Sequence, residues 1–187
     1  TSFGNQAQAT NDFSSAIGYK ARASEKYAVA IGSGADSFAN NTQASGESSV
    51  AIGGNSSAGA KSSGKNAVAI AGESVASGAN AIAIGRKSTS SNVGAIALGD
   101  SGTASGAQAI AVGESSVASG AQAISIGRSS LASNTQTIAI GDTSLASGAN
   151  AIATGFGSKA TNTNDYAAGT GAQAVGGWGI AIGNNTY

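Results

Sequence analysis

The chain has 187 residues with nine basic and nine acidic side chains, and it contains no Pro, Cys, Met or His. A net charge of zero excludes the concentrated Lys and Arg with which proteins bind nucleic acids or acidic membranes. Without His or Cys the chain lacks the usual general bases, the thiol nucleophiles and most ligands of transition metals. We therefore expect no catalytic residue, no cofactor and no metal site.

The first seventy residues follow a step of fourteen with two interruptions. Gly4, Gly18 and Gly32 keep this step, and Gly53 follows after 21 residues. The surplus residues fall at 33–39 and 54–57. Loops that leave a repeat often carry binding features, and they are also where neutral insertions are best tolerated. The sequence leaves both explanations open.

From residue 72 to residue 183 the repeat is regular. Its last residue is a glycine that recurs every 14 positions, at Gly85, Gly99, Gly113, Gly127, Gly141, Gly155, Gly169 and Gly183. A strict period this short predicts a solenoid in which each repeat forms one coil. We expect an all-β fold and a single domain over residues 1–187, with regular coils at 72–183.

Each coil is predicted to hold two short strands. The second strand, as in AIAIG, is apolar on both faces, which indicates that both faces are covered. We expect the large side chains to fill the coil and the alanines to face neighbouring chains. A coil of 14 residues cannot cover both faces alone, so the sequence predicts an oligomer. The residues expected to form the core and the oligomer contact are Ile82, Ala83, Ile84, Ile96, Ala97, Ile110, Ala111, Ile124, Ile126, Ile138 and Ile140.

The first strand, as in SVASG, has one face of small residues only, such as Ser116 and Ala118. Its other face accepts residues as different as Val117, Leu131 and Lys159. A position that tolerates Lys is open to water. This strand is predicted to face solvent on one side and a narrow interior on the other.

Two columns are predicted to form the turns in a left-handed backbone conformation. One is the terminal glycine, with Ala71 as an exception. The other alternates between glycine and asparagine, the residues that enter this conformation most cheaply, with Glu25 as an exception. The second column includes Gly78, Asn92, Gly106, Gly120, Asn134 and Gly148.

Two polar columns are candidate sites. Asp100 and Glu114 lie one coil apart, but they share a column with Arg86, Arg128 and Asp142, which favours a solvated charge ladder over a carboxylate pair. An amide column could bind protein or glycan, although hydrogen bonding between stacked amides is the simpler interpretation. It contains Asn80, Gln108, Gln122, Gln136, Asn150 and Asn164 and ends at Trp178, the only Trp, which could cap the stack or meet an adjoining domain.

Repeats such as NAIAIG (80–85), AQAIAVG (107–113) and SVASGAQAISIG (116–127) closely resemble the head domains of trimeric autotransporter adhesins, of the Yersinia-adhesin-like (YadA-like) type. The resemblance covers essentially the whole chain. It implies a left-handed parallel β-roll of about 14-residue coils, a side-by-side homotrimer, and display on the surface of a Gram-negative bacterium.

The same resemblance implies attachment to host cells or to extracellular-matrix proteins, through an outer-membrane anchor that lies outside this sequence. Members of this family differ in what they bind, so the resemblance assigns no ligand-binding residue. The alternative function is a non-adhesive β-solenoid, such as a fibre spacer or an ice-binding protein. Ice binding favours a flat array of Thr, whereas the outward columns here mix Val, Thr, Leu, Lys and Gln.

Overall fold

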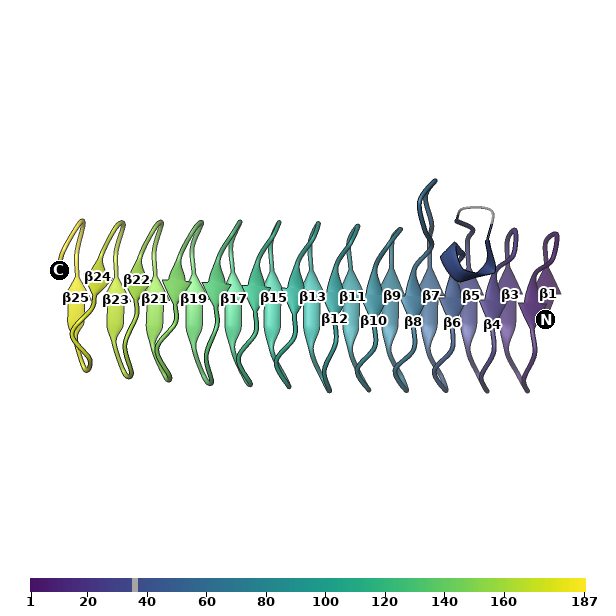
Figure 1. The fold of residues 1–187 in the computed structure, drawn as a ribbon, viewed down its shortest axis with the longest axis horizontal. Coiled ribbons are helices and arrows are strands. Elements are labelled where there is room, and N and C mark those ends of the chain that lie inside the picture. Colours follow the sequence, from purple (N-terminus) through teal and green to yellow (C-terminus); the bar gives the residue numbers. More distant parts are fainter. Residues whose placement is uncertain (35–36) are drawn as a thin grey trace. The chain divides into compact units, whose positions relative to one another are not determined.

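The computed structural model describes residues 1–34 and 37–187. The chain forms two compact units, Thr1–Leu98 and Gly99–Tyr187. Both units consist of very short strands joined by tight turns (Figure 1). The predicted fold class is confirmed, because the chain is an all-β parallel β-solenoid of about 13 turns with coils of about 14 residues.

The described residues of the first unit, 1–34 and 37–98, form thirteen strands and one short 3-10 helix. The strands are β1 (Ser2–Phe3), β2 (Gln8–Ala9), β3 (Ser15–Ile17), β4 (Arg22–Ala23), β5 (Val29–Ile31), β6 (Gln43–Ala44), β7 (Val50–Ile52), β8 (Lys61–Ser62), β9 (Val68–Ile70), β10 (Val75–Ala76), β11 (Ile82–Ile84), β12 (Thr89–Ser90) and β13 (Ile96–Leu98), and the helix is η1 (Phe38–Asn40).

The second unit contains twelve strands. They are β14 (Thr103–Ala104), β15 (Ile110–Val112), β16 (Val117–Ala118), β17 (Ile124–Ile126), β18 (Leu131–Ala132), β19 (Ile138–Ile140), β20 (Leu145–Ala146), β21 (Ile152–Thr154), β22 (Lys159–Ala160), β23 (Tyr166–Ala168), β24 (Gln173–Ala174) and β25 (Ile180–Ile182). No helix in the described ranges is long and apolar enough to cross a membrane.

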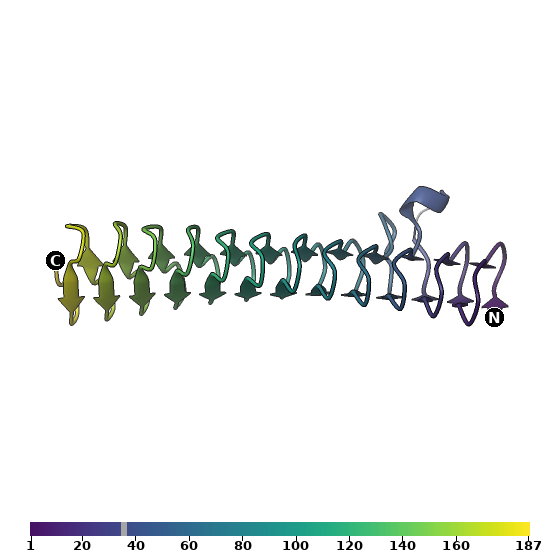
Figure 2. The ribbon, with the colours of Figure 1, turned by 90° about the horizontal axis from the view of Figure 1, so that it is seen from below.

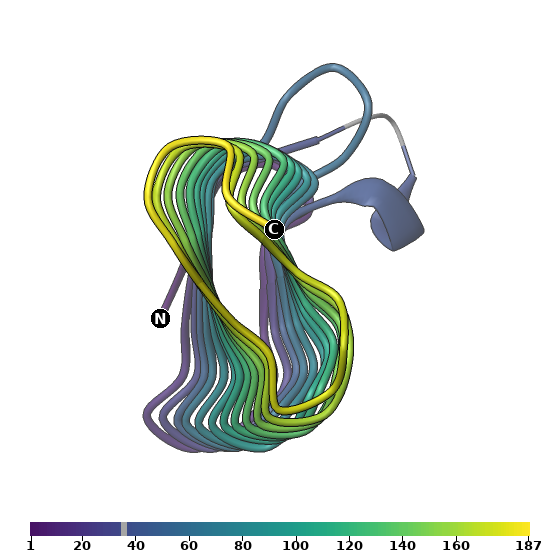
Figure 3. The same cartoon turned by 90° about the vertical axis from the view of Figure 1, so that its left-hand side faces the viewer.

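Within each unit the odd-numbered strands form one parallel sheet and the even-numbered strands form another. Ile110 of β15 is paired with Ile124 of β17, and Val117 of β16 is paired with Leu131 of β18. Each pairing therefore advances by one coil of 14 residues. Figure 2 shows the two kinds of strand as separate rows of arrows, and Figure 3 shows the coils of each unit stacked behind one another.

The interior of each coil is lined by alanine and serine. Ala111 from the odd-numbered strands and Ala118 from the even-numbered strands have no solvent exposure, and Ser116 is likewise fully buried. The prediction for the face of small residues on the first strand is therefore confirmed. Small residues meet small residues across the coil, so that the two sheets lie close together.

The predicted orientation of the AIAIG strand is wrong. Ala83, Ala97 and Ala111 point into the coil with no exposure, whereas Ile84 is 38% exposed and points outward. The same holds for the other large side chains of this set, namely Ile82, Ile96, Ile110, Ile124, Ile126, Ile138 and Ile140, which are all partly or largely exposed. The physical reason is the narrow interior, which has no room for Ile side chains.

Two tight turns close each coil, as at Gly127–Ser130 and Gly120–Ala123. In each, the N–H of the fourth residue donates to the carbonyl oxygen of the first, at 3.4 and 3.2 Å respectively. The third residue is left-handed in both, with φ 54° at Ser129 and 59° at Gln122. A positive φ at this position is the mark of a type II turn.

The left-handed prediction is confirmed for the terminal glycine and wrong for the second column. Gly127 has φ 130°, a conformation that is open only to glycine in practice. None of Gly78, Asn92, Gly106, Gly120, Asn134 and Gly148 has a positive φ; each is the first residue of its turn. The left-handed residue comes two positions later, in the amide column.

Close packing explains the glycine at position 120. A Cβ built on Gly120 would overlap the backbone carbonyl of Asn134 in the next coil. The exceptional Glu25 needs no left-handed conformation, and its carbonyl accepts the usual turn hydrogen bond from Ala28 at 3.1 Å. The exceptional Ala71, at the other position, has φ 89° and lies in the coil that follows the second insertion.

The surplus residues at 33–39 and 54–57 lie in the β5–β6 and β7–β8 connections of the first unit. Ala35 and Asp36 are outside the described residues. The first connection contains η1, and the second is closed by an isolated antiparallel bridge between Gly54 and Gly59. Both insertions follow odd-numbered strands, so they leave the same edge of the coils (Figure 3).

Candidate functional site

The outward face of the odd-numbered strands carries two columns of aliphatic side chains. The parallel register places Ile82 beside Ile96 in the first unit, and Ile124 beside Ile138 in the second. Ile126 and Ile140 remain 38% and 40% exposed. A partly exposed, mostly apolar surface of this kind is typical of a site of interaction with another macromolecule.

The outward face of the even-numbered strands has no such pattern. Val117 and Leu131 are neighbours there, but Lys61 and Gln43 occupy the same column in the first unit. These side chains are half-buried, and the small residues behind them fill the coil. The prediction of a solvent-facing strand is confirmed, and this face presents a mixed surface.

The amide column forms ladders along the edge of each unit. Asn66 donates to Asn80 at 3.2 Å in the first unit. In the second, Gln122 donates to Gln108 and Gln136 donates to Gln122, both at 3.3 Å. Asn150 donates to Asn164 at 3.1 Å. The predicted stacking of amides is confirmed, and each of these ladder residues has a left-handed backbone.

The column of Asp and Arg residues is a surface charge ladder, as predicted. Arg128 and Asp142 form an ion pair at 2.7 Å, and the side chain of Arg128 is 59% exposed. The hydroxyl of Ser101 donates to Asp100 at 2.8 Å. Within residues 1–34 and 37–187, no group of three or more acidic side chains is placed to hold a metal ion.

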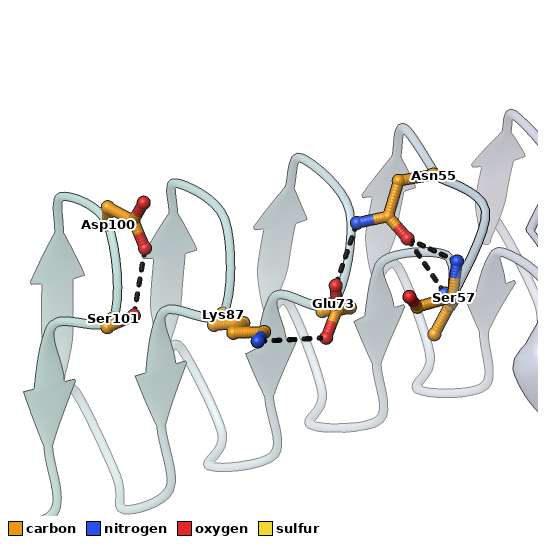
Figure 4. A network of polar contacts seen from close by, with 7 residues as sticks. Asn55, Ser57, Glu73, Lys87, Asp100 and Ser101 are labelled. Atoms are coloured by element: carbon orange, nitrogen blue, oxygen red, sulfur yellow. Dashed lines mark hydrogen bonds and ion pairs between the residues drawn. The ribbon is translucent and has the colours of Figure 1, made fainter.

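The second insertion is fixed by a polar network in the first unit (Figure 4). The Asn55 side-chain amide donates to Glu73 at 2.8 Å and accepts from the backbone N–H groups of Ser57 and Ala58. The ammonium nitrogen of Lys87 lies 3.8 Å from a carboxylate oxygen of Glu73. These contacts give the loop a defined conformation, so it presents a fixed shape to any partner.

Asp165 is the residue that sequence reasoning missed. It is 1% exposed, and its carboxylate accepts from the N–H groups of Asn162 and Gly179, both at 2.9 Å, and from the Asn162 side chain at 3.3 Å. Burial alone would raise the pKa of Asp165, but these hydrogen bonds and one from the Gly177 backbone bring it below its ordinary value.

The signal that could have identified Asp165 lies in its column. The other coils of the second unit place Ala109, Ala123, Thr137 and Ala151 at the equivalent position, and all four are buried. A carboxylate in a column of small buried residues requires a set of hydrogen-bond donors. Here the donors come from Asn162, in the turn that Asp165 ends, and from Gly177 and Gly179 on either side of Trp178 in the next coil. Trp178 is 79% exposed with φ 58°.

Comparisons with known proteins agree with this architecture. The family model of the YadA head domain repeat, which spans two copies of the repeat, matches residues 1–21, 9–35, 40–56, 44–70, 76–101, 104–130 and 132–158. Among solved structures, the chain is similar to the collagen-binding domain of the Yersinia adhesin YadA, with 26% identity and a TM-score of 0.56 over 83% of this chain and 70% of that one. No curated protein matches the chain.

Proposed function

The chain belongs to the YadA head domain repeat family, and on that premise we propose that it is the head of a homotrimeric bacterial surface adhesin. Residues 1–187 act as a single head domain. It is displayed outside a Gram-negative cell and anchored in the outer membrane by a region outside this sequence. The head attaches the cell to host cells or to extracellular-matrix proteins and catalyses no reaction.

The observation that carries this proposal is the aliphatic face of the odd-numbered strands. In the second unit its Ile and Val side chains are Ile110, Val112, Ile124, Ile126, Ile138, Ile140, Ile152, Ile180 and Ile182. Covering the exposed part of each contributes about 0.5–1 kcal/mol. Nine such side chains together contribute about 5–9 kcal/mol per chain, which is comparable with the roughly 4–15 kcal/mol that association costs in lost translational and rotational freedom.

A trimer covers this face economically, because each chain presents the same columns to its neighbours about a shared axis. The alanines fill each coil and the isoleucines fill the contact between chains. The residues predicted as core and oligomer contact therefore divide into two sets. Ala83, Ala97 and Ala111 pack inside the coil, and the isoleucines form the proposed contact between chains.

Adhesion in this proposal uses the repeated outer surface of the trimer. The even-numbered strands and the amide ladders present similar groups in successive coils of a unit and on three chains. Repeated weak contacts add through effective concentration, so that avidity exceeds single-site affinity by about 10²–10⁴. The relative of known structure is described as a collagen-binding domain, which supports a matrix protein as the ligand class.

A binding screen tests the function. The purified chain is measured against immobilised collagen, fibronectin and laminin and against cultured cells, with an assembly-deficient variant carrying Ile110→Asp and Ile124→Asp as comparison. We expect binding by the wild type and its loss in the variant. Absence of binding to every surface would contradict an adhesive function and favour a spacer.

Deletion of residues 54–57 separates a distributed surface from a discrete site. These surplus residues are held by Asn55 and its contacts with Glu73. If the repeated surface carries adhesion, the deletion leaves binding within about twofold of the wild type. Loss of binding with the trimer intact would place the site at this loop and overturn the distributed surface.

A further inference from the structure

A groove in the second unit combines an exposed aromatic ring with uncharged polar side chains. Its volume is about 440 Å³, and its lining includes Asn134, Ser147, Thr161, Asn162, Thr163 and Trp178. Sites for small ligands have volumes of about 300–1,000 Å³, with a few polar groups that fix the orientation of the ligand. The groove has the size of a short oligosaccharide.

We propose that this groove binds a neutral oligosaccharide, with a sugar ring stacked on Trp178. Trp178 is 79% exposed, so its ring is accessible to a ligand. None of the lining residues carries a charge. Hydroxyl and amide groups both donate and accept hydrogen bonds, as sugar hydroxyls do.

Unused polar groups support a sugar over an extended peptide. In the described part of the chain, the hydroxyls of Ser147 and Thr163 and the indole N–H of Trp178 make no hydrogen bond to protein. The backbone beside them is already paired, because the N–H of Ser147 donates to Ala160 at 3.0 Å and that of Trp178 donates to Thr163 at 3.1 Å. A peptide strand needs free backbone groups for pairing.

Buried Asp165 holds the two sides of the groove in place. One of its oxygens accepts from the backbone N–H of Gly179, next to Trp178, and the other accepts from the backbone and side chain of Asn162. The carboxylate is buried, so it positions these groups without presenting its charge to the ligand. A groove organised in this way loses little freedom when a ligand binds.

The biological role of this groove rests on the proposed adhesive function, but the two can fail separately. Absence of sugar binding leaves the assembly of the trimer and its matrix binding unchanged. Conversely, sugar binding by a chain that attaches to no matrix protein or cell would leave the groove as a binding site and remove the adhesive role.

The single Trp makes the test direct. The assembled wild-type chain is titrated with lactose, N-acetyllactosamine, chitotriose and maltotriose up to about 10 mM while Trp fluorescence is recorded. We expect a saturable change with at least one of them. By calorimetry, Trp178→Ala should weaken that sugar by about tenfold or more, and Trp178→Phe should weaken it less.

Phe156→Ala is the matched control, because Phe156 is another exposed aromatic of the same unit, 59% exposed, and lies in the opposite turn. It should leave binding unchanged.

Three results would overturn the proposal. They are no response to any sugar, equal losses in Phe156→Ala and Trp178→Ala, and a Trp178 that acrylamide does not quench in the assembled protein. Binding of a triple-helical Gly-Pro-Pro peptide at Trp178, without any sugar, would assign the groove to a protein ligand instead.

Discussion

The two sheets of a coil share one interior but differ on their outer faces. Inside, Ala111 of an odd-numbered strand and Ala118 of an even-numbered strand are equally buried. Outside, the odd-numbered strands carry mostly Ile and Val, with exceptions such as Thr154 and Tyr166, whereas the even-numbered strands alternate among Val, Thr, Leu, Lys and Gln. The isoleucines are therefore not needed to fill the coil, and their repetition supports the proposed contact with other copies of the chain.

Enlarging the interior should produce the largest effect. Ala111→Leu forces a branched side chain between the two sheets, and overpacking should lower the free energy of unfolding by about 3 kcal/mol per chain. The melting temperature by circular dichroism measures this effect. Thr103→Leu is the control, since Leu131 and Leu145 already occupy that outward column. Equal melting temperatures for the two variants would contradict the narrow interior.

Gly120 tests the close approach of successive coils. Both Gly120→Asn and Gly120→Val add a Cβ that meets the Asn134 backbone, and each should cost about 1–3 kcal/mol of stability. Thermal melting measures both variants, with Ser119→Asn as an exposed control. A wild-type melting temperature for the Asn variant alone would show instead that glycine is chosen for its backbone conformation.

Gln122 tests where the left-handed conformation lies. Its φ of 59° is costly for a β-branched residue, so Gln122→Val should lower stability by about 1–2 kcal/mol. Gln122→Asn should be nearly neutral, because Asn150 has the same conformation. Denaturant unfolding compares the two variants. Equal midpoints for Val and Asn would contradict the assignment of this turn position.

Asp165 should give a smaller, pH-dependent effect. Because hydrogen bonding lowers its pKa in the folded state, its ionised form stabilises the fold above the unfolded pKa of about 3.9. This contribution is lost as pH falls through the folded pKa. The melting temperature of the wild type should therefore exceed that of Asp165→Asn at pH 7, and the difference should shrink as the pH is lowered below the unfolded pKa of about 3.9. A difference that does not change with pH would contradict this role.

The period and the two strands of each coil could be predicted from sequence, because terminal glycines recur at fixed spacing and each strand has its own pattern. The orientation of AIAIG could not, since a strand that is apolar on both faces has no polar side to define the outside. Composition also does not locate the left-handed turn position, because it identifies residues that permit a positive φ, such as Gly120, and not residues such as Gln122 that adopt one. Gln122 also makes ladder hydrogen bonds with Gln108 and Gln136.

Sedimentation equilibrium of the purified chain tests the central claim most directly. We expect a trimer with three times the 17.6 kDa of one chain, and the double variant Ile110→Asp with Ile124→Asp should be a monomer. The matched pair Thr103→Asp with Val117→Asp, on the outer face of the other sheet, should leave the trimer intact. A wild-type monomer, or equal dissociation by both pairs, would contradict the assignment of the aliphatic face to the contact between chains.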